Sequence, residues 1–136
     1  MKLIRRCLPE LPKQDPKGAI VNICSTVAVR GSAADVAYTA SKHALLGLTH
    51  STAWGYAKEG TRRNVVIPGG VGDAQMMSGT DPVVFQSAGF QVTGPFQACM
   101  PGMCKPEDIA SVAPFLMTAP AVNGVELAVD HGWTVA

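Results

Sequence analysis

Three short apolar runs, each bounded by turn residues, predict buried strands of a parallel sheet. The first extends from Ala19 to Cys24 and follows a turn at residues 15–18. Runs of this length and character are typical of strands that are covered on both faces. A second run extends from Asn64 to Ile67 and is ended by Pro68, because proline cannot donate to a sheet ladder. Residues 125–129 supply the last strand.

Helical patterns separate these strands and complete an α/β fold. A long helix is predicted from about Val36 to Lys58, with Gly60 near the expected terminating position. Its apolar residues are distributed around much of the helix, so we expect it to be buried on more than one side. Another helix extends from Pro106 to about Met117, because proline in the first turn is followed by two acids near the positive end of the helix dipole.

The segment 71–103 mixes glycines, prolines, methionines and phenylalanines without clean periodicity. We interpret it as a mobile substrate lid with one or two short helices. Four of its larger apolar side chains are the expected walls of a substrate site, and these are Met76, Met77, Phe85 and Phe96. The length of 136 residues corresponds to about one domain, and we expect residues 1–136 to form it.

Charge and composition argue against several classes of function. A net charge of +1 with mixed signs gives no electrostatic basis for binding nucleic acid. The pair Arg62-Arg63, which we place at a strand entrance, is too small a patch to change this. The basic N-terminal segment has no long apolar core, so we expect neither a signal peptide nor a membrane span. Only 15% of the residues are charged, which suggests that partner subunits cover part of the surface in a homo-oligomer.

Cysteine and histidine positions indicate no metal centre. The four cysteines contain no CxxC pair, so a reduced state in the cytoplasm is the default expectation. Cys99 and Cys104 could be considered as metal ligands together with His131, but their spacing fits no common zinc pattern. His43 and His50 lie on the long helix and are expected to be packing or surface residues.

Tyr38 and Lys42 carry the strongest chemical signal in the chain. They are four residues apart in the predicted helix and therefore share one of its faces. Ser25 lies thirteen positions before Tyr38, at the end of the first strand. A nearby positive charge favours phenolate over phenol, and a tyrosine tuned in this way can donate or remove the proton of an alcohol or carbonyl oxygen. The alternative is that Tyr38 packs the helix start, Lys42 is solvated and Ser25 is an ordinary hydroxyl.

Five segments, in matching order and spacing over nearly the whole chain, resemble landmarks of the short-chain dehydrogenase/reductase family. They are residues 18–25, 37–44, 64–71, 105–110 and 123–130. The resemblance implies the last three strands of a doubly wound, mostly parallel Rossmann-like sheet, with the helices between them. It also implies an NAD(P)-dependent oxidoreductase that interconverts a small-molecule alcohol and ketone, with NAD or NADP as cofactor.

The resemblance also implies roles for individual residues. Tyr38 would be the acid/base, Lys42 would assist it and bond the nicotinamide ribose, and Ser25 would hold and polarise the substrate oxygen. Besides Tyr38 and Lys42, the cofactor would contact the segment after the second strand through Pro68, Gly69 and Val71.

By the same resemblance, the sequence begins about halfway through the family's usual fold. Nothing before Ser25 resembles the glycine-rich turn that receives the dinucleotide, so 1–136 would be a truncated Rossmann-like domain with its first strand as an edge. Three functions stay open: an oxidoreductase, completed by another chain or competent alone; a non-catalytic interaction module that pairs with a full-length relative; and an inactive fragment of such an enzyme. His131 replaces a glycine of the family's Asp-Gly-Gly-like ending, which would disturb a tight turn.

Overall fold

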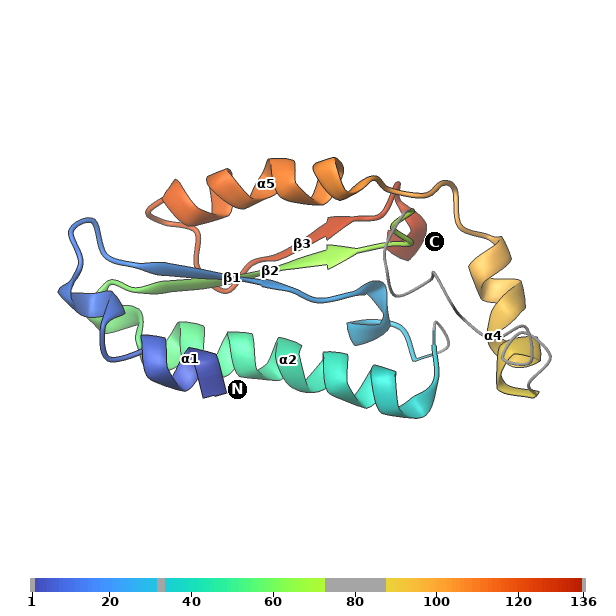
Figure 1. Ribbon diagram of the computed structural model, residues 1–136, viewed down its shortest axis with the longest axis horizontal. Helices are drawn as coiled ribbons and strands as arrows, with labels where there is room; N and C mark the ends of the chain where they lie inside the picture. Colours follow the sequence, from blue (N-terminus) through green and yellow to red (C-terminus); the bar gives the residue numbers. More distant parts are fainter. Residues whose placement is uncertain (1, 32–33, 73–87, 136) are drawn as a thin grey trace.

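The computed structural model describes residues 2–31, 34–72 and 88–135. Three parallel strands form one sheet, with a long helix on each face (Figure 1). The helices and strands are, in chain order, α1 (Lys2–Cys7), β1 (Ala19–Ile23), α2 (Val36–Gly55), β2 (Arg62–Pro68), α4 (Ala88–Ala98), α5 (Pro106–Thr118) and β3 (Glu126–Val129). This arrangement confirms the predicted α/β class.

The sheet has β2 at its centre, in the order β1-β2-β3. Ala19 of β1 lies opposite Arg62, and Val65 lies opposite Glu126 of β3. Because parallel neighbours need crossover connections, α2 leads from β1 to β2 across one face, and α5 precedes β3 on the other face (Figure 1). The carboxyl ends of all three strands therefore lie at one edge of the sheet, and α2 begins near that edge.

Every residue of β2 is buried. Val65 and Ile67 belong to a hydrophobic cluster on the α2 side of the sheet. Val66 belongs to a second cluster on the opposite side, with Ile109 and Leu116 of α5. A strand that is covered on both faces needs a nearly continuous apolar sequence, which is why this strand could be predicted from its sequence run.

The strand β2 begins two residues earlier than expected, so Arg62 and Arg63 lie inside the sheet rather than at its entrance. The Arg62 guanidinium donates to the Leu116 carbonyl at 2.8 Å, near the end of α5, where the helix dipole favours a positive charge. Arg63 is fully buried, donates to the Thr61 hydroxyl at 2.6 Å and lies 4.6 Å from the centre of the Tyr56 ring. Carbonyls, a hydroxyl and an aromatic ring thus stabilise the two guanidinium groups inside the protein, although a pair of charged residues in a sequence indicates a surface position.

Helix α2 is buried on one side, which contradicts the expected burial on several sides. Its buried side chains are Thr49 and Ala53, whereas Trp54 is 86% exposed. Alanine favours helix formation in any environment, so the many alanines of this helix did not indicate burial. The apolar character of the helix was a poor guide to its surroundings.

Several element boundaries differ from the expected ones by a few residues. α2 ends at Gly55, and a separate 3-10 turn, Ala57–Glu59, follows it. Gly60 ends that turn with a left-handed φ of 76°, a conformation that favours glycine. β1 ends at Ile23 and β3 begins at Glu126, each one residue inside the predicted range.

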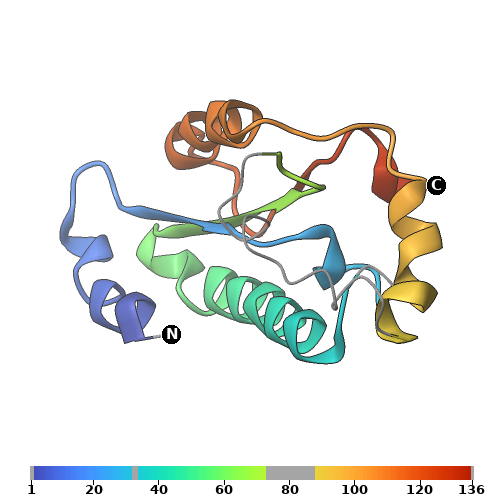
Figure 2. The same ribbon diagram turned by 45° about the vertical axis from the view of Figure 1, so that its right-hand side comes forward.

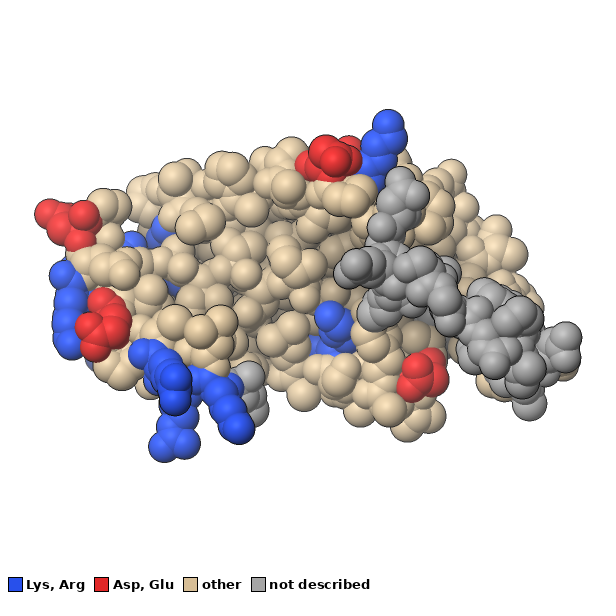
Figure 3. All heavy atoms as spheres, viewed as in Figure 1, with Lys and Arg blue, Asp and Glu red and all other residues tan. Residues whose placement is uncertain are grey.

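The face seen in Figure 3 is mostly uncharged, and most of its charged side chains lie toward its periphery. Helix α1 carries Arg5 and Arg6 in its last turn. Within the ranges that the structure describes, no helix is both long enough and apolar enough to cross a membrane.

A buried carboxylate organises the turn that follows β3. Asp130 accepts hydrogen bonds from the Gly132 N–H at 3.0 Å and from the N–H and hydroxyl of Thr134 at 2.8 and 2.6 Å. Burial alone would raise the pKa of Asp130, but these hydrogen bonds outweigh it and hold the pKa below its ordinary value. His131 has a φ of 55°, in the left-handed region that favours glycine, and the network around Asp130 holds it there.

The packing beneath α5 predicts a large effect for Leu116→Ala. Leu116 is fully buried in the cluster around Val66, so its truncation should lower the free energy of unfolding by about 2–5 kcal/mol. The neighbouring Phe115 is exposed, and Phe115→Ala should change stability by only about 0.5 kcal/mol. Urea denaturation of both variants measures the difference, and equal losses would contradict the described orientation of α5.

The Asp130 network predicts an acid-dependent contribution to stability. Its folded-state pKa is depressed, so the contribution is present above the unfolded-state pKa of about 3.9 and is lost as pH falls through the lower folded-state value. Asp130→Asn should therefore lower the unfolding free energy at neutral pH and flatten its decline below about pH 4. Denaturation at a series of pH values tests this, with the exposed Asp15→Asn as control. An Asp130→Asn curve parallel to the wild-type curve would refute it.

Candidate active site at the carboxyl ends of the strands

Ser25 follows the end of β1 and begins the next turn. The strand ladder continues to Cys24, whose N–H donates to the Val66 carbonyl at 2.8 Å. Ser25 then caps a 3-10 turn, Thr26–Ala28, and its hydroxyl oxygen accepts from the Val27 N–H at 3.4 Å. The three residues of the turn are buried, whereas Ser25 is only half-buried. The serine hydroxyl is therefore held at the carboxyl edge of the sheet.

Tyr38 and Lys42 lie on the first turns of α2, as the sequence predicted. Asp35 begins this helix by accepting a hydrogen bond from the Tyr38 N–H at 3.0 Å. The Lys42 ammonium lies 5.4 Å from the centre of the Tyr38 ring, within the range of a cation–π interaction. The shared helix face is thus occupied by a phenol and a positive charge in direct contact.

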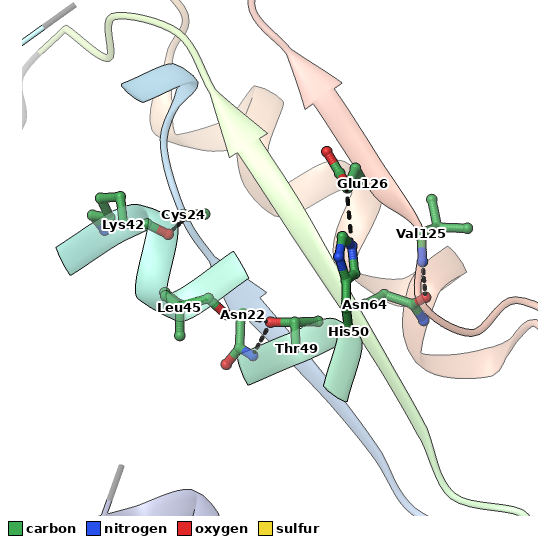
Figure 4. Close-up of polar contacts among 9 residues, drawn as sticks. All are labelled: Asn22, Cys24, Lys42, Leu45, Thr49, His50, Asn64, Val125 and Glu126. Atoms are coloured by element: carbon green, nitrogen blue, oxygen red, sulfur yellow. Dashed lines mark hydrogen bonds and ion pairs between the residues drawn. The ribbon is translucent and has the colours of Figure 1, made fainter. Parts of the chain in front are cut away.

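Lys42 also connects α2 to the end of β1. Its ammonium donates to the Ile23 carbonyl at 3.5 Å. The main-chain carbonyl of Lys42 accepts a hydrogen bond from the Cys24 thiol at 3.3 Å (Figure 4). About two turns further along the helix, Thr49 accepts a hydrogen bond from the Asn22 side chain at 2.9 Å (Figure 4). Several contacts therefore fix the position of α2 along β1.

Tyr38 packs against the hydrophobic cluster formed by Val27 and Trp133, and Phe96 and Met100 pack against the same cluster. Helix α2 thus contacts the chain before Ser25, where Lys42 donates to the Ile23 carbonyl, and the cluster that includes Val27 after it. Ser25, which follows β1, and the start of α2, which carries Tyr38 and Lys42, therefore lie at the same edge of the sheet.

The predicted cofactor segment lies at the same edge, at the end of the neighbouring strand. Pro68 is the last residue of β2, and the Gly69 N–H donates to the Val129 carbonyl at 3.0 Å. Val71 forms a single parallel bridge to Cys104, and its side chain packs into the cluster on the α5 side. These residues lie beside the end of β1 because β1 and β2 are parallel neighbours.

The glycines of this segment are needed for packing within the protein. A side chain at Gly69 would place its Cβ 3.0 Å from Asp130, and one at Gly70 would place it 2.6 Å from the Met100 sulfur and 2.8 Å from the Met103 sulfur. The turn after β3 and the methionines that follow α4 therefore come too close to this segment for larger residues.

Of the predicted substrate-lining residues, Phe96 lies in the described part of the chain. Met76, Met77 and Phe85 lie outside the described residues. Phe96 belongs to α4 and stacks on Trp133, with ring centres 4.8 Å apart and planes 28° from parallel. The segment 71–103 therefore contains a helix that packs against the same cluster as Tyr38.

Sequence reasoning missed the C-terminal turn as part of this site. Trp133 donates its indole N–H to the Phe96 carbonyl at 3.3 Å, and Figure 2 shows α4 beside the C-terminal end of the described chain. The Arg30 guanidinium donates to the Thr134 carbonyl and connects this turn to the loop after Ser25. Only a tryptophan close behind an Asp-Gly-Gly-like ending could have drawn attention to this turn, since its partners are distant in sequence.

A hollow on the α5 side of this edge contains none of the predicted catalytic residues. It measures about 380 Å³, lies between α5 and the end of β3, and is lined by Asp108 and His131 among others. Burial raises the pKa of the Cys24 and Cys104 thiols. Within the described ranges, no group of three or more His, Cys, Asp and Glu side chains could hold a metal ion.

Similarity to known proteins covers nearly the whole chain. The model of a family described as enoyl-(acyl carrier protein) reductase matches residues 1–134. The short-chain dehydrogenase/reductase cdmF of Talaromyces verruculosus is 39% identical, over 98% of this chain and 55% of its own length. The chain thus spans about half the length of the curated relatives it matches, and corresponds to their C-terminal half.

Solved structures show the same fold. The TT0495 protein from Thermus thermophilus superimposes with a TM-score of 0.79 at 28% identity, over 98% of this chain and 55% of that one. A candidate NAD(P)-dependent gluconate 5-dehydrogenase from Beutenbergia cavernae, with NADP bound at low occupancy, has a TM-score of 0.78 at 31% identity, over 98% and 52%. The three-stranded sheet is therefore Rossmann-like, as predicted. The chain belongs to the short-chain dehydrogenase/reductase family.

Proposed function

We propose that this chain carries the proton-transfer site of an NAD(P)-dependent oxidoreductase that interconverts an alcohol and a ketone. The observation that carries the proposal is that α2 contacts the chain both before and after Ser25 in the sequence. Lys42 donates to the Ile23 carbonyl, and Tyr38 packs against the cluster of Val27 and Trp133. A hydroxyl, a phenol and an ammonium at one sheet edge are the groups needed to bind and protonate a carbonyl oxygen.

Each of the three residues has a distinct role in this proposal. Tyr38 gives its phenolic proton to the substrate oxygen during reduction and takes it back during oxidation. Lys42 places its positive charge 5.4 Å from the centre of the Tyr38 ring. Ser25 accepts from the Val27 N–H only at 3.4 Å, and its own hydroxyl proton can be donated to the substrate oxygen. A bound nicotinamide supplies the hydride for the carbonyl carbon.

The hydrogen bonding of Lys42 supports the assignment of a nicotinamide cofactor to this site. Among the described residues, the one hydrogen bond of the Lys42 ammonium is the long contact to Ile23, so two of its three N–H donors can serve a ribose hydroxyl. Pro68, Gly69 and Val71 would supply main-chain contacts beside the nicotinamide ring, because they lie at the end of the adjacent strand. The family relationship and the NADP in the related Beutenbergia cavernae structure support this assignment.

The substrate side of the site favours an apolar ketone or alcohol. Phe96 and Met100 pack in the cluster of Tyr38, so a substrate that reaches the phenol passes an aromatic ring and a thioether. The segment 71–103 would act as the lid over this space, with Met76, Met77 and Phe85 as further walls.

A specific observation favours a second candidate function, pairing with another polypeptide. Within the described residues, β1 has a single strand neighbour, and Ile23 on this edge strand is 48% exposed. An open edge with an exposed apolar side chain can accept a further strand. The chain spans about half the length of its relatives, so the added strand could come from a second copy or from a full-length relative. Such a partner could complete an enzyme or be the target of a non-catalytic module.

The proton-transfer proposal predicts that Tyr38→Phe lowers NAD(P)H-dependent ketone reduction by about 10²–10⁴-fold, because phenylalanine has no proton to give. Tyr56→Phe is a matched control, since Tyr56 is the other tyrosine and contacts Arg63 through its ring. The rate of NADH or NADPH oxidation with an apolar ketone measures both. A Tyr38→Phe variant within about twofold of the wild-type rate would refute the assigned role.

The cofactor assignment is tested by calorimetric titration of the purified chain with NADH and NADPH. We expect heat with at least one of them, and Lys42→Met should weaken the binding by about tenfold because a charged hydrogen-bond donor is lost. Lys58→Met, on the exposed turn after α2, should leave it unchanged. No heat at millimolar cofactor, together with complex formation that survives Tyr38→Phe, would instead support the non-catalytic pairing module.

A further inference from the structure

Trp133 is buried although it lies close to the last described position of the chain. Only 5% of its surface is exposed, whereas the other tryptophan, Trp54, is 86% exposed. Its turn is fixed from both sides: Asp130 binds the Thr134 N–H and hydroxyl, and Arg30 donates to the Thr134 carbonyl. The indole is therefore presented by a rigid turn rather than by a free chain end.

The indole holds α4 through two different contacts to one residue. Its ring stacks on the Phe96 ring at 4.8 Å, and its N–H donates to the Phe96 carbonyl at 3.3 Å. The ring contact determines which face of α4 packs inward. The hydrogen bond fixes the position of α4 relative to the C-terminal turn. None of the described α4 side chains is fully buried, so this helix depends strongly on such individual contacts.

The same indole reaches the proton-transfer side of the site. Trp133 forms one cluster with Val27, and Tyr38 and Phe96 both pack against that cluster. The spacing between α4 and the start of α2 is therefore set across the cluster of Val27 and Trp133. A change in the size of the Trp133 side chain would change the space between Tyr38 and α4.

We propose that Trp133 is a positioning residue that fixes α4 relative to Tyr38 and thereby sets the size of the substrate that the site accepts. The substrate part of this inference rests on the proposed function, whereas the positioning of α4 does not. Because Trp133 positions α4 and takes no part in proton transfer, its substitution should weaken substrate binding more than it slows the chemical step.

Hydrogen exchange of the purified chain, followed by mass spectrometry, tests the positioning directly. Trp133→Leu should accelerate exchange of the α4 amides by about tenfold or more, because stacking and the indole hydrogen bond are both lost. Trp133→Phe keeps an aromatic ring and should give an intermediate acceleration. The β2 amides should be unchanged in both variants, and Trp54→Leu, at the exposed tryptophan, should match the wild type throughout.

Two exchange results would overturn the proposal. One is an α4 that exchanges at the wild-type rate in Trp133→Leu, or that shows no protection even in the wild type. The other is an acceleration of α4 and β2 by the same factor in both Trp133 variants, which would make Trp133 an ordinary core residue.

Kinetics separate this proposal from the proposed function. Trp133→Leu should raise the KM for a bulky apolar ketone by about fivefold or more and leave kcat within about twofold. A fall in kcat at unchanged KM would overturn the substrate-sizing role. A wild-type chain that reduces no ketone would refute the proposed function, while the exchange result would still decide whether Trp133 holds α4.

Discussion

The complete burial of β2 between two helical layers is the constraint on which the rest of this structure depends. Both neighbours of β2 are parallel to it, so the chain must cross from one end of the sheet to the other before each new strand. The crossovers place α2 on one face and α5 on the other (Figure 1). As a consequence, β1 ends, α2 begins and the Pro68–Gly69 segment leaves the sheet at the same edge, which is where open α/β sheets bind ligands.

The burial of β2 removes two arginine side chains from water, and their polar contacts offset this unfavourable desolvation only in part. Arg62 has carbonyl partners near the end of α5, including Leu116. Arg63 is different: its Nε and one Nη lack a hydrogen-bond partner among the described residues, and burial lowers its pKa. The ring of Tyr56 offers partial compensation. Hydrogen bonds to carbonyls and a hydroxyl, together with the ring, therefore stabilise the first residues of β2.

Much of the sheet could be predicted from the sequence, because strands that are covered on both faces contain apolar runs, such as residues 65–67 of β2. The pairing of Tyr38 with Lys42 was equally accessible, since positions four apart share a helix face. The placement of both residues near the end of β1 was not, because it depends on how α2 packs along β1, through contacts such as that between Asn22 and Thr49. Only the family resemblance placed Ser25 with them.

Other features could not be predicted because their partners are distant in sequence. The indole of Trp133 contacts Phe96, which lies thirty-seven positions before it in the sequence, and a contact at this separation cannot be predicted from a local sequence pattern. The arginines of β2 were misplaced for the same reason, since their charge indicated the surface and their partners are supplied by the tertiary structure. The burial of α2 was overestimated because alanine is common in helices whether they are covered or exposed.

The candidate site and a dinucleotide crevice depend on different parts of the fold. Ser25, Tyr38 and Lys42 are positioned by contacts among β1, α2 and the C-terminal turn, all of which lie within the described residues. A dinucleotide crevice forms where strand order reverses, and the order β1-β2-β3 contains no reversal. A reversal would require a strand on the open side of β1. The placement of these three residues is therefore intrinsic to this part of the fold, whereas the dinucleotide binding that we propose would depend on what pairs with that open edge.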